Sequence, residues 1–491
     1  MTSTAVQRDR GKAGNQAEGR NPFSWRFVAP LFMGSTLNPI NSSVIATALV
    51  AIAAAVHVSV GKTAVLVTAL YLASAIAQPT CGKLAEVFGP RRVFLAGILT
   101  VLVGGLVGGF GQNLTTLIVS RILIGIGTSA GYPSAMLLIR RRAEEAGLAA
   151  PPGGVLGGLQ IAGTVTAALG LPIGGVLVAA WGWRTTFFLN VPFALLALAM
   201  AVFWIPRDRH IEGPRNVRDI AARIDVTGII GFGTAMTALL VFLFSLPHPS
   251  WLVLGLAVVL GAGLVGWELR TRHPFVDVRL LAANLALTRT YLRMALMTLC
   301  VYTVLYGLTQ WLEAGRGITS REAGLLLLPM TGLSALVVGP ISRRNLVRGP
   351  LIVAAGSSLV ASIGVLLLGT STPTIWIVAI TLIFGITLGT TVSGNQTALY
   401  TQVTASQLGT ASGLFRTFSY LGSIASSAMI SIVFHTSVTD SGLHVIALIM
   451  IGVSAVALLI TLADRQLRTQ PQAVPTRSGA PTTEHAEGES P

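Results

Sequence analysis

The sequence predicts an all-α membrane protein: two bundles of six transmembrane helices with an inserted helix pair between them. The chain has 491 residues, of which 52% are hydrophobic and only 10% are charged, whereas soluble domains carry about 25% charged residues. Fourteen apolar runs approach the length of about 20 residues that a helix needs to cross the hydrocarbon. Basic residues fall in the short gaps between these runs. This composition excludes a water-soluble core.

The runs follow one another with few long interruptions. They are expected at 28–50, 63–81, 93–111, 114–138, 153–180, 186–206, 225–246, 251–269, 290–312, 322–341, 350–369, 374–395, 408–435 and 443–463. Lys and Arg in alternate gaps identify the cytoplasmic side, because positively charged loops stay inside. Twenty-seven lie in one set of gaps and at the two ends, against four in the other set. Both termini are therefore expected in the cytoplasm.

The spacing of the runs predicts the domain organisation. We expect a disordered cytoplasmic N-terminus (1–26), an N-terminal six-helix bundle (27–206), a cytoplasmic linker (207–223), the inserted pair (224–270), a second linker (271–289), a C-terminal six-helix bundle (290–464) and a disordered cytoplasmic tail (465–491). The two ends are too polar to bury a core. Repeated bundles with a site at their interface are how many secondary transporters are built.

A glycine-punctuated segment, GKLAEVFGPRR, joins the second and third runs. It resembles the signature loop of the major facilitator superfamily, G-x-L-A-D-R-x-G-R-R, and differs from it at Glu86, Val87 and Pro90. The alternative is an ordinary basic turn. The resemblance implies a conformational latch, in which Glu86 accepts hydrogen bonds from a neighbouring helix N-terminus or pairs with an arginine. The expected latch residues are Gly82, Glu86, Gly89, Arg91 and Arg92.

Further stretches, in the family's order, resemble the fourteen-span drug:proton antiporter branch of that superfamily. They are R-x-x-x-G-x-G from Arg121, GLPIGG from Gly170, W-R-x-x-F-x-x-N-x-P from Trp183, HPFVDVRLL from His273 and A-G-x-x-x-L-P from Ala323. In the fifth span, small residues and proline let helices pack closely and bend. Packing alone and a coupling role both remain open for this antiporter-motif helix, with Gly157, Gly170, Pro172, Gly174 and Gly175.

The position of the usual proton-binding acid holds an amide. Proton-driven members of the branch have D-x-T-I-V-x-x-A-L in the first span, and here the matching run begins at Asn41. None of the 18 acidic residues lies in the middle of a span. Because an amide does not exchange a proton near neutral pH, coupling is expected to be absent, to use a peripheral acid such as Glu86 or Glu313, or to exchange an anion through Arg121.

Arg121 lies inside the fourth span. A cation there costs about 2.5–3.5 kcal/mol on insertion scales and normally has a partner. It either bonds Asn41, Asn38 or backbone carbonyls, or contacts an anionic substrate group; Arg416 is expected to snorkel to the cytoplasmic end of its helix. Amides at mid-depth complete a path suited to an amphipathic ligand. The expected path residues are Asn38, Asn41, Arg121, Gln160, Gln310, Asn395 and Gln396.

The resemblance implies a secondary active transporter of the cell membrane that exports small amphipathic, drug- or antibiotic-like compounds by alternating access with proton antiport. The alternatives are an uncoupled or anion-exchanging transporter of organic anions, lipids or metabolites, or, remotely, a membrane-embedded enzyme. The histidines lack H-E-x-x-H spacing, and no Walker loop is present. We therefore expect no enzyme, cofactor or metal. The expected partners are the bilayer, a small-molecule substrate and, where the coupling implied by the resemblance holds, protons. No nucleic-acid partner is expected, and the protein is expected to be a monomer.

Overall fold

The computed structural model describes residues 22–467, except 59–62, 64, 149, 209–223, 246–248, 273, 319, 345, 405–406, 435–436 and 465–466. Every regular element within these residues is helical. The expected disordered N-terminus up to residue 21, most of the 207–223 linker and the tail from 468 lie outside the described residues. The domain boundaries at those places therefore stay predictions.

The helices of the first predicted bundle precede the inserted pair. They are α2 (Trp25–Val44), continued by the 3-10 turn η1 (Ile45–Ala48) and α3 (Leu49–Ala55), then α5 (Val65–Phe88), α6 (Pro90–Gly109), α7 (Leu114–Ser129), α8 (Gly131–Glu145), α9 (Gly153–Trp181), α10 (Thr185–Phe188) and α11 (Asn190–Trp204). The inserted pair is α13 (Val226–Phe244) and α14 (Trp251–Glu268).

The second bundle follows the short helix α15 (Val278–Ala283). It consists of α16 (Leu285–Thr303) with the π-helical turns η2 (Val304–Leu308) and η3 (Trp311–Gly315), then α17 (Ser320–Arg343), α18 (Arg348–Leu366), α19 (Thr374–Gln402), α20 (Leu408–Val433) and α21 (Asp440–Ala463). Each bundle has its own apolar core, built around Phe94 and Met136 in the first and around Trp311 and Phe384 in the second.

Each of the fourteen predicted runs coincides with a helix, and eleven helical segments within the described residues are long and apolar enough to cross a membrane. The three long helices outside that group are α2, α9 and α20, with 20, 29 and 26 residues. The multi-span membrane character is therefore established, while the count of fourteen spans and the side on which the termini lie stay predictions.

The structure corrects one expected connection and adds detail at two other places. The segment expected as a polar turn is almost entirely helical: α5 continues to Phe88 and α6 begins at Pro90. Only Gly89 intervenes, with a φ of +100° that glycine adopts readily, and a proline suits the first helical position. The fourth expected span divides into α7 and α8 near Pro133, which has no N–H for the helix ladder. The expected linker 271–289 contains α15.

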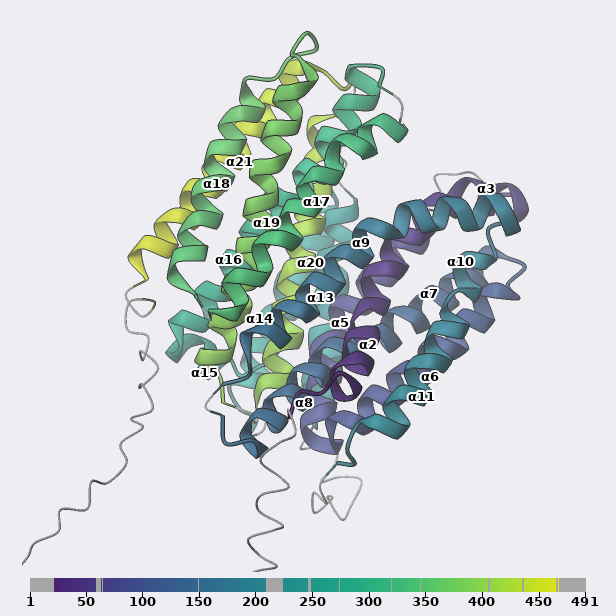
Figure 1. Cartoon of the computed structure of the whole chain (residues 1–491), viewed down its shortest axis with the longest axis vertical. Helices are drawn as coiled ribbons and strands as arrows, with labels where there is room; N and C mark the ends of the chain where they lie inside the picture. Colours follow the sequence, from purple (N-terminus) through teal and green to yellow (C-terminus); the bar gives the residue numbers. More distant parts are fainter. Residues whose placement is uncertain are drawn as a thin grey trace, which may run out of the picture.

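The two bundles meet at one end and diverge toward the other (Figure 1). The contacts between them run mainly through α5 with α20, α8 with α20, and α9 with α17. The described chain begins and ends at the end where the bundles meet, which we call the gate end. This arrangement leaves the diverging end as the wider one.

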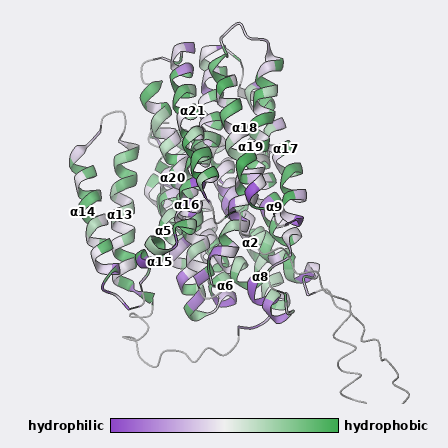
Figure 2. Cartoon of the chain, turned by 90° about the vertical axis from the view of Figure 1, so that its left-hand side faces the viewer, coloured by the Kyte–Doolittle hydropathy of each residue, from purple (hydrophilic) through white to green (hydrophobic). Residues whose placement is uncertain are grey.

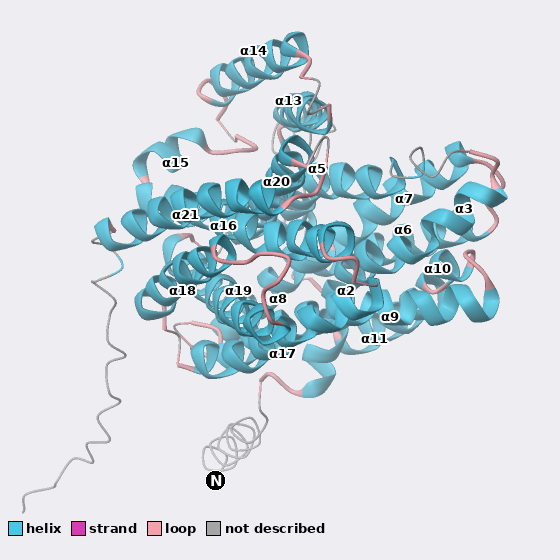
Figure 3. Ribbon diagram, turned by 90° about the horizontal axis from the view of Figure 1, so that it is seen from above, coloured by secondary structure: helices cyan, strands magenta, loops and turns pink. Residues whose placement is uncertain are grey.

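The inserted pair stands beside the bundles rather than between them (Figures 2 and 3). Helix α13 packs on α5 and α20, and α14 packs on α13. The outer face of α14 is strongly apolar, with Leu252 81% exposed and Val259 67% exposed. Such a face suits contact with hydrocarbon rather than water.

Candidate functional site

Glycines bring α5 and α20 into backbone contact at the gate end. A Cβ added to Gly82 would lie 2.2 Å from the carbonyl oxygen of Gly409, and one added to Gly409 would lie 2.5 Å from that of Gly82. One turn further along α20, a Cβ on Gly413 would lie 2.5 Å from the carbonyl oxygen of Gln78. No side chain fits in this seam, so the two bundles close on each other directly.

Glu86 spans the same seam with its carboxylate. The backbone N–H of Thr410 donates to Oε1 at 2.7 Å, and the Thr410 hydroxyl donates to Oε2 at 3.0 Å. Thr410 lies in the first turn of α20, where free N–H groups and the helix dipole favour an anion. Of the two partners expected for Glu86, the structure has the helix N-terminus.

The other expected latch residues cluster around an acid that the sequence analysis did not select. Asp208, whose side chain is 3% exposed, accepts from the backbone N–H of Arg91 at 3.2 Å and of Arg92 at 3.0 Å. It also lies 3.6 Å from Arg141 and against Gly89. The guanidinium of Arg91 donates instead to the carbonyl of Val202 at 2.8 Å. The sequence signal that could have identified Asp208 is its position as an acidic residue just after the sixth apolar run.

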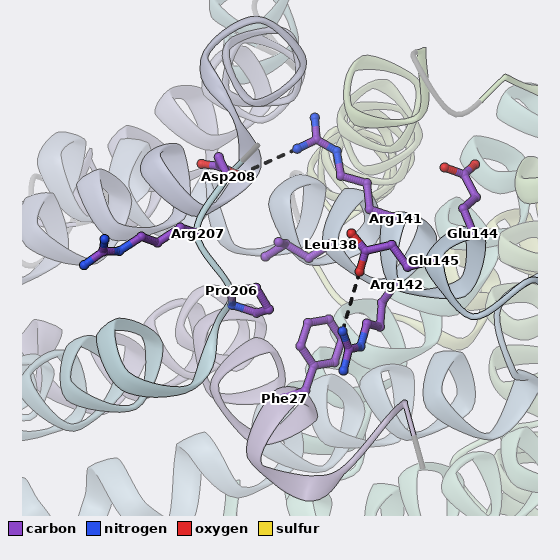
Figure 4. Close-up of a pocket in the computed structure, with 9 residues that line it drawn as sticks. All are labelled: Phe27, Leu138, Arg141, Arg142, Glu144, Glu145, Pro206, Arg207 and Asp208. Atoms are coloured by element: carbon purple, nitrogen blue, oxygen red, sulfur yellow. Dashed lines mark ion pairs between the residues drawn. The ribbon is translucent and has the colours of Figure 1, made fainter. Parts of the chain in front are cut away.

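A pocket of about 450 Å³ opens beside Asp208 (Figure 4). It lies between the end of α8, the start of α2 and the segment after α11, and contains the Arg142–Glu145 ion pair at 3.5 Å. None of the expected path residues lines it. We therefore assign this pocket to the surface of the gate end and not to the substrate path.

A hydrogen-bonded network joins the bundles deeper inside. The amide of Asn38 donates to Ser74 Oγ at 3.0 Å and Thr128 Oγ1 at 2.9 Å, and its Oδ1 accepts from the hydroxyl of Tyr420 at 2.7 Å. That hydroxyl also accepts from Gln78 Nε2 at 2.9 Å. The network connects α2, α5 and α7 to α20, and Gln78 and Tyr420 belong to the site although they were not among the expected path residues.

Two more groups lie between the bundles. The guanidinium of Arg416 on α20 sits 4.1 Å from the ring centroid of Tyr132 on α8, and its Nε is buried without a hydrogen-bond partner. This differs from the expected snorkelling position. Instead, a cation–π interaction with the ring from the opposite bundle stabilises the charge of Arg416. Gln396, 2% exposed, points its Nε2 at Met136 Sδ at 3.8 Å, and its Oε1 is unpartnered.

Asn41 and Arg121 lie within the first bundle. Asn41 exchanges amide hydrogen bonds with Asn190 at 2.6 and 3.0 Å, and donates to the carbonyl of Leu37 at 2.8 Å. Arg121, 1% exposed, donates to the carbonyls of Leu66 at 3.0 Å and of Asn41 at 3.1 Å. Of the two interpretations of Arg121, these bonds favour the structural one.

The remaining expected path residues do not gather at one place. Gln160 on α9 is 7% exposed and contacts Thr164 in its own helix at 3.4 Å, whereas Gln310 is exposed. Asn395 is buried inside the second bundle, where its Oδ1 accepts from Arg293 Nε at 3.3 Å. Arg293 is itself 1% exposed and lies inside α16.

Arg293 has an acidic partner that the sequence analysis did not assign to it. Its guanidinium lies 2.9 Å from Asp464, which is 0% exposed and also pairs with Arg289 at 3.2 Å. Asp464 follows directly after α21 and Arg293 lies inside α16. An ion pair between the first and last helices of a bundle has no local sequence signal.

The expected antiporter-motif helix α9 uses its glycines on two sides. A Cβ on Gly170 would lie 2.4 Å from Ser43 Cβ, and one on Gly174 would lie 2.9 Å from the carbonyl oxygen of Val44, both in the first bundle. A Cβ on Gly157 would lie 2.6 Å from Ser342 in the second bundle, whereas Gly175 faces open space. The side chain of Pro172 lies outside the described residues.

The sequence model described as the Major Facilitator Superfamily matches residues 31–427. The chain belongs to this superfamily. Proteins that resemble the chain in sequence include the MFS-type transporter YwoD of Bacillus subtilis, 33% identical over 89% of the chain and 96% of YwoD. Another is the tetracenomycin C resistance and export protein of Streptomyces glaucescens, 27% identical over 90% of the chain and 81% of that protein.

The fold is also that of the superfamily. The human organic anion transporter MFSD10 has a TM-score of 0.62 at 16% identity, over 90% of this chain and 100% of that one. The proton:xylose symporter XylE has a TM-score of 0.60 at 14% identity, over 89% of this chain and 95% of that one. The chain is thus a multi-span membrane transporter, and its family and structural neighbours are transporters rather than enzymes.

Proposed function

We propose that this transporter exports small amphipathic organic compounds across the cell membrane by alternating access, working as a monomer in the bilayer with no nucleic-acid partner. The observation that carries the proposal is the seam at the gate end, where Gly82 and Gly409 touch and Glu86 bonds the first turn of α20. A contact this local can be made and broken as two bundles rock. The tetracenomycin C resistance and export protein among the relatives supports the direction.

The cargo class follows from the residues above the seam. Besides the guanidinium of Arg416, the polar groups there include amides and hydroxyls, from Asn38, Gln78 and Tyr420. The ring of Tyr71 lies 5.8 Å from that of Tyr420. Aromatic surface with a few neutral polar groups suits a compound with an apolar body and a polar end. The basic gate end would face the cytoplasm, because Lys and Arg gather on that side of membrane proteins.

Proton coupling is proposed at a position other than residue 41. The Asn41 amide is bonded to Asn190 and Leu37 and has no proton to exchange near neutral pH. The test is flux of cationic, neutral and carboxylated fluorescent amphiphiles in proteoliposomes, with and without a pH gradient. We expect gradient-driven flux of at least one class, retained in Asn41→Ala. Equal flux without a gradient would contradict coupling, and absence of all flux would contradict export.

The latch is tested separately. Leu137 is 2% exposed and faces Gly409 across the seam, so Leu137→Cys, with Cys81 and Cys300 replaced by serine, reports opening of the gate end by thiol labelling. Because hydrogen bonds to charged groups contribute about 1.5–3 kcal/mol, we expect Glu86→Gln to raise the labelling rate roughly tenfold or more. Glu144→Gln, whose carboxylate pairs with Arg140 in its own helix at 2.9 Å, is the control. Unchanged labelling in Glu86→Gln would contradict the latch.

One observation favours a second candidate, a transporter of organic anions. Arg416 lies between the bundles with a buried Nε that has no partner, so it and not Arg121 is the cation that an anionic substrate could reach. Thermal-shift measurements on purified protein distinguish the candidates. Stabilisation by carboxylated but not cationic compounds, lost in Arg416→Gln and kept in Arg121→Lys, would support the anion transporter.

A further inference from the structure

Two buried acids meet at the base of the inserted pair, outside the substrate path. Asp225 precedes α13 and is 3% exposed, and Glu268 ends α14 and is 1% exposed. Both carboxyl groups pack against Gly228: a Cβ there would lie 2.2 Å from Asp225 Oδ2 and 2.7 Å from Glu268 Oε1. The two acids are therefore neighbours in a site with almost no access to water.

The hydrogen-bond donors are divided unequally between the two acids. Asp225 accepts from the N–H of Gly228 at 2.9 Å, from Trp267 Nε1 at 2.9 Å and from the N–H of Phe275 at 3.1 Å. Glu268 Oε1 accepts from the N–H of Val276 at 3.1 Å, and Glu268 Oε2 is buried without a partner among the described residues. Because N–H donors stabilise the ionised form of a carboxyl group, the negative charge is favoured on Asp225.

The surrounding charges do not neutralise a second negative charge. Among the described residues, neither acid forms an ion pair. The charged groups on the adjoining elements have other contacts: Lys83 of α5 donates to the carbonyl of Pro274 at 3.1 Å, Arg279 of α15 to that of Leu269, and Asp277 accepts from the N–H of Leu280 at 2.8 Å. Arg272 lines the neighbouring pocket, together with Lys83 and Asp277.

We propose that Glu268 and Asp225 form a proton-binding site, in which Glu268 carries the proton and Asp225 stays ionised. The proton removes one of two adjacent buried charges and turns the orphaned Oε2 into a donor. Binding is a simple equilibrium with water in which no other bond forms or breaks. The site differs from the position of Asn41 and does not depend on the cargo: a chain that moved no organic compound would still bind this proton.

The two acids hold the segment from Pro274 to Val276, which leads to the gate end. Phe275 and Val276, whose N–H groups bond the two acids, follow Pro274, which accepts from Lys83 three residues before Glu86. Loss of the proton would place two negative charges together and draw water to the site. The N–H groups of residues 275 and 276 would then lose their protection, so proton occupancy controls how firmly this segment is held.

Infrared spectroscopy of the purified full-length protein tests the proton directly. We expect the carbonyl stretching band of a protonated, desolvated carboxylic acid at neutral pH, and its loss in Glu268→Gln. Glu144→Gln, which changes an exposed acid of α8, should leave the band unchanged. Absence of the band from the unmodified protein, or its full persistence in Glu268→Gln, would overturn the proposal.

Hydrogen exchange at residues 275–276 tests the consequence. After correction for the intrinsic effect of pH, we expect exchange to accelerate in the unmodified chain as the pH rises from neutral to alkaline, and to lose this extra dependence in Glu268→Gln. Asp225→Asn removes the neighbouring negative charge while keeping Glu268, and should move the loss of the infrared band to lower pH. An unmoved titration in Asp225→Asn, or unchanged pH dependence in Glu268→Gln, would contradict the assignment even if one variant proved unstable.

Discussion

Each bundle buries an arginine, and the two bundles stabilise that charge in different ways. Arg121 in the first bundle bonds two backbone carbonyls, those of Leu66 and Asn41. Arg293 in the second bundle has a buried carboxylate, Asp464, at 2.9 Å, with Asn395 and Thr290 as further partners. The first arrangement keeps a net positive charge inside the bundle, whereas in the second the buried Arg293–Asp464 pair is neutral and Asp464 also pairs with the partly exposed Arg289. The comparison shows that a buried cation in this chain does not by itself mark a substrate site.

The largest expected loss of stability comes from removing Asp464, the acid that pairs with the buried Arg293. Asp464→Asn leaves Arg293 buried without its counter-ion, which costs about 3–5 kcal/mol in comparable cases. We expect a large fall in the unfolding temperature, measured by size-exclusion of heated protein in detergent. Glu144→Gln should change it little, because its pair is exposed. Recovery in the double variant Arg293→Met with Asp464→Leu would confirm the pair as the cause, and no recovery would contradict it.

Replacing Arg121 should reduce the stability less than Asp464→Asn does, because no buried charge is left without its counter-ion. Arg121→Met leaves the carbonyls of Leu66 and Asn41 without their donor, with an expected loss of about 2–3 kcal/mol. Arg121→Lys keeps the positive charge but lacks the planar guanidinium fork. Its stability should therefore lie between that of the unmodified protein and that of Arg121→Met. The same heated-protein assay measures both. A loss as large as that of Asp464→Asn would break the contrast between the bundles.

Restoring an acid beside Arg121 tests the electrostatics of the first bundle. The Asn41 Nδ2 group donates to Asn190 Oδ1 and to the Leu37 carbonyl, so an ionised Asn41→Asp would face two oxygens there. We expect a loss of about 2 kcal/mol at neutral pH that shrinks as the pH falls, because the protonated acid can donate again. Asn41→Ala is the pH-independent control. Greater stability of Asn41→Asp at alkaline pH would show that Arg121 dominates.

The smallest expected effect is the difference in stability between alanine substitutions at two neighbouring glycines of α9. Gly174→Ala meets Thr47 and the Val44 carbonyl of α2 and should cost about 1 kcal/mol, the lower end for overpacking. Gly175→Ala meets nothing within 4 Å and should be neutral or stabilising by about 0.5 kcal/mol. Thermal unfolding and flux should be measured together. Loss of flux in Gly175→Ala at unchanged stability would indicate a coupling role beyond packing.

Much of the fold could be predicted because the local sequence is enough to identify a membrane helix. Each run of apolar residues has to satisfy its own backbone hydrogen bonds in hydrocarbon, so it becomes a helix whatever its neighbours are. The glycine seam was predictable in part, since Gly82 and Glu86 stand in a recognisable pattern. Its partners, Gly409 and Thr410, lie more than 300 residues away, and nothing in the local sequence selects them.

The polar residues show the limit of such reasoning. An amide or arginine inside an apolar run is equally suited to a path and to a helix contact, and only the direction of the side chain distinguishes them. Asn38 and Gln396 point between the bundles, whereas Asn41 and Asn395 point into one bundle each. The acids that matter at the gate end and at the inserted pair, such as Asp208 and Glu268, stand at helix ends, where an acid usually appears only as a solvated charge.

The sequence by itself determined the membrane environment, the helices and the superfamily, because hydropathy and short motifs are properties of neighbouring residues. The tertiary structure alone decided which charges meet: Glu86 with α20, Arg293 with Asp464, and Glu268 with Asp225. These pairings join residues from distant parts of the chain. Their free energies depend on burial and on the geometry of donors and acceptors, and both exist only after the helices have packed.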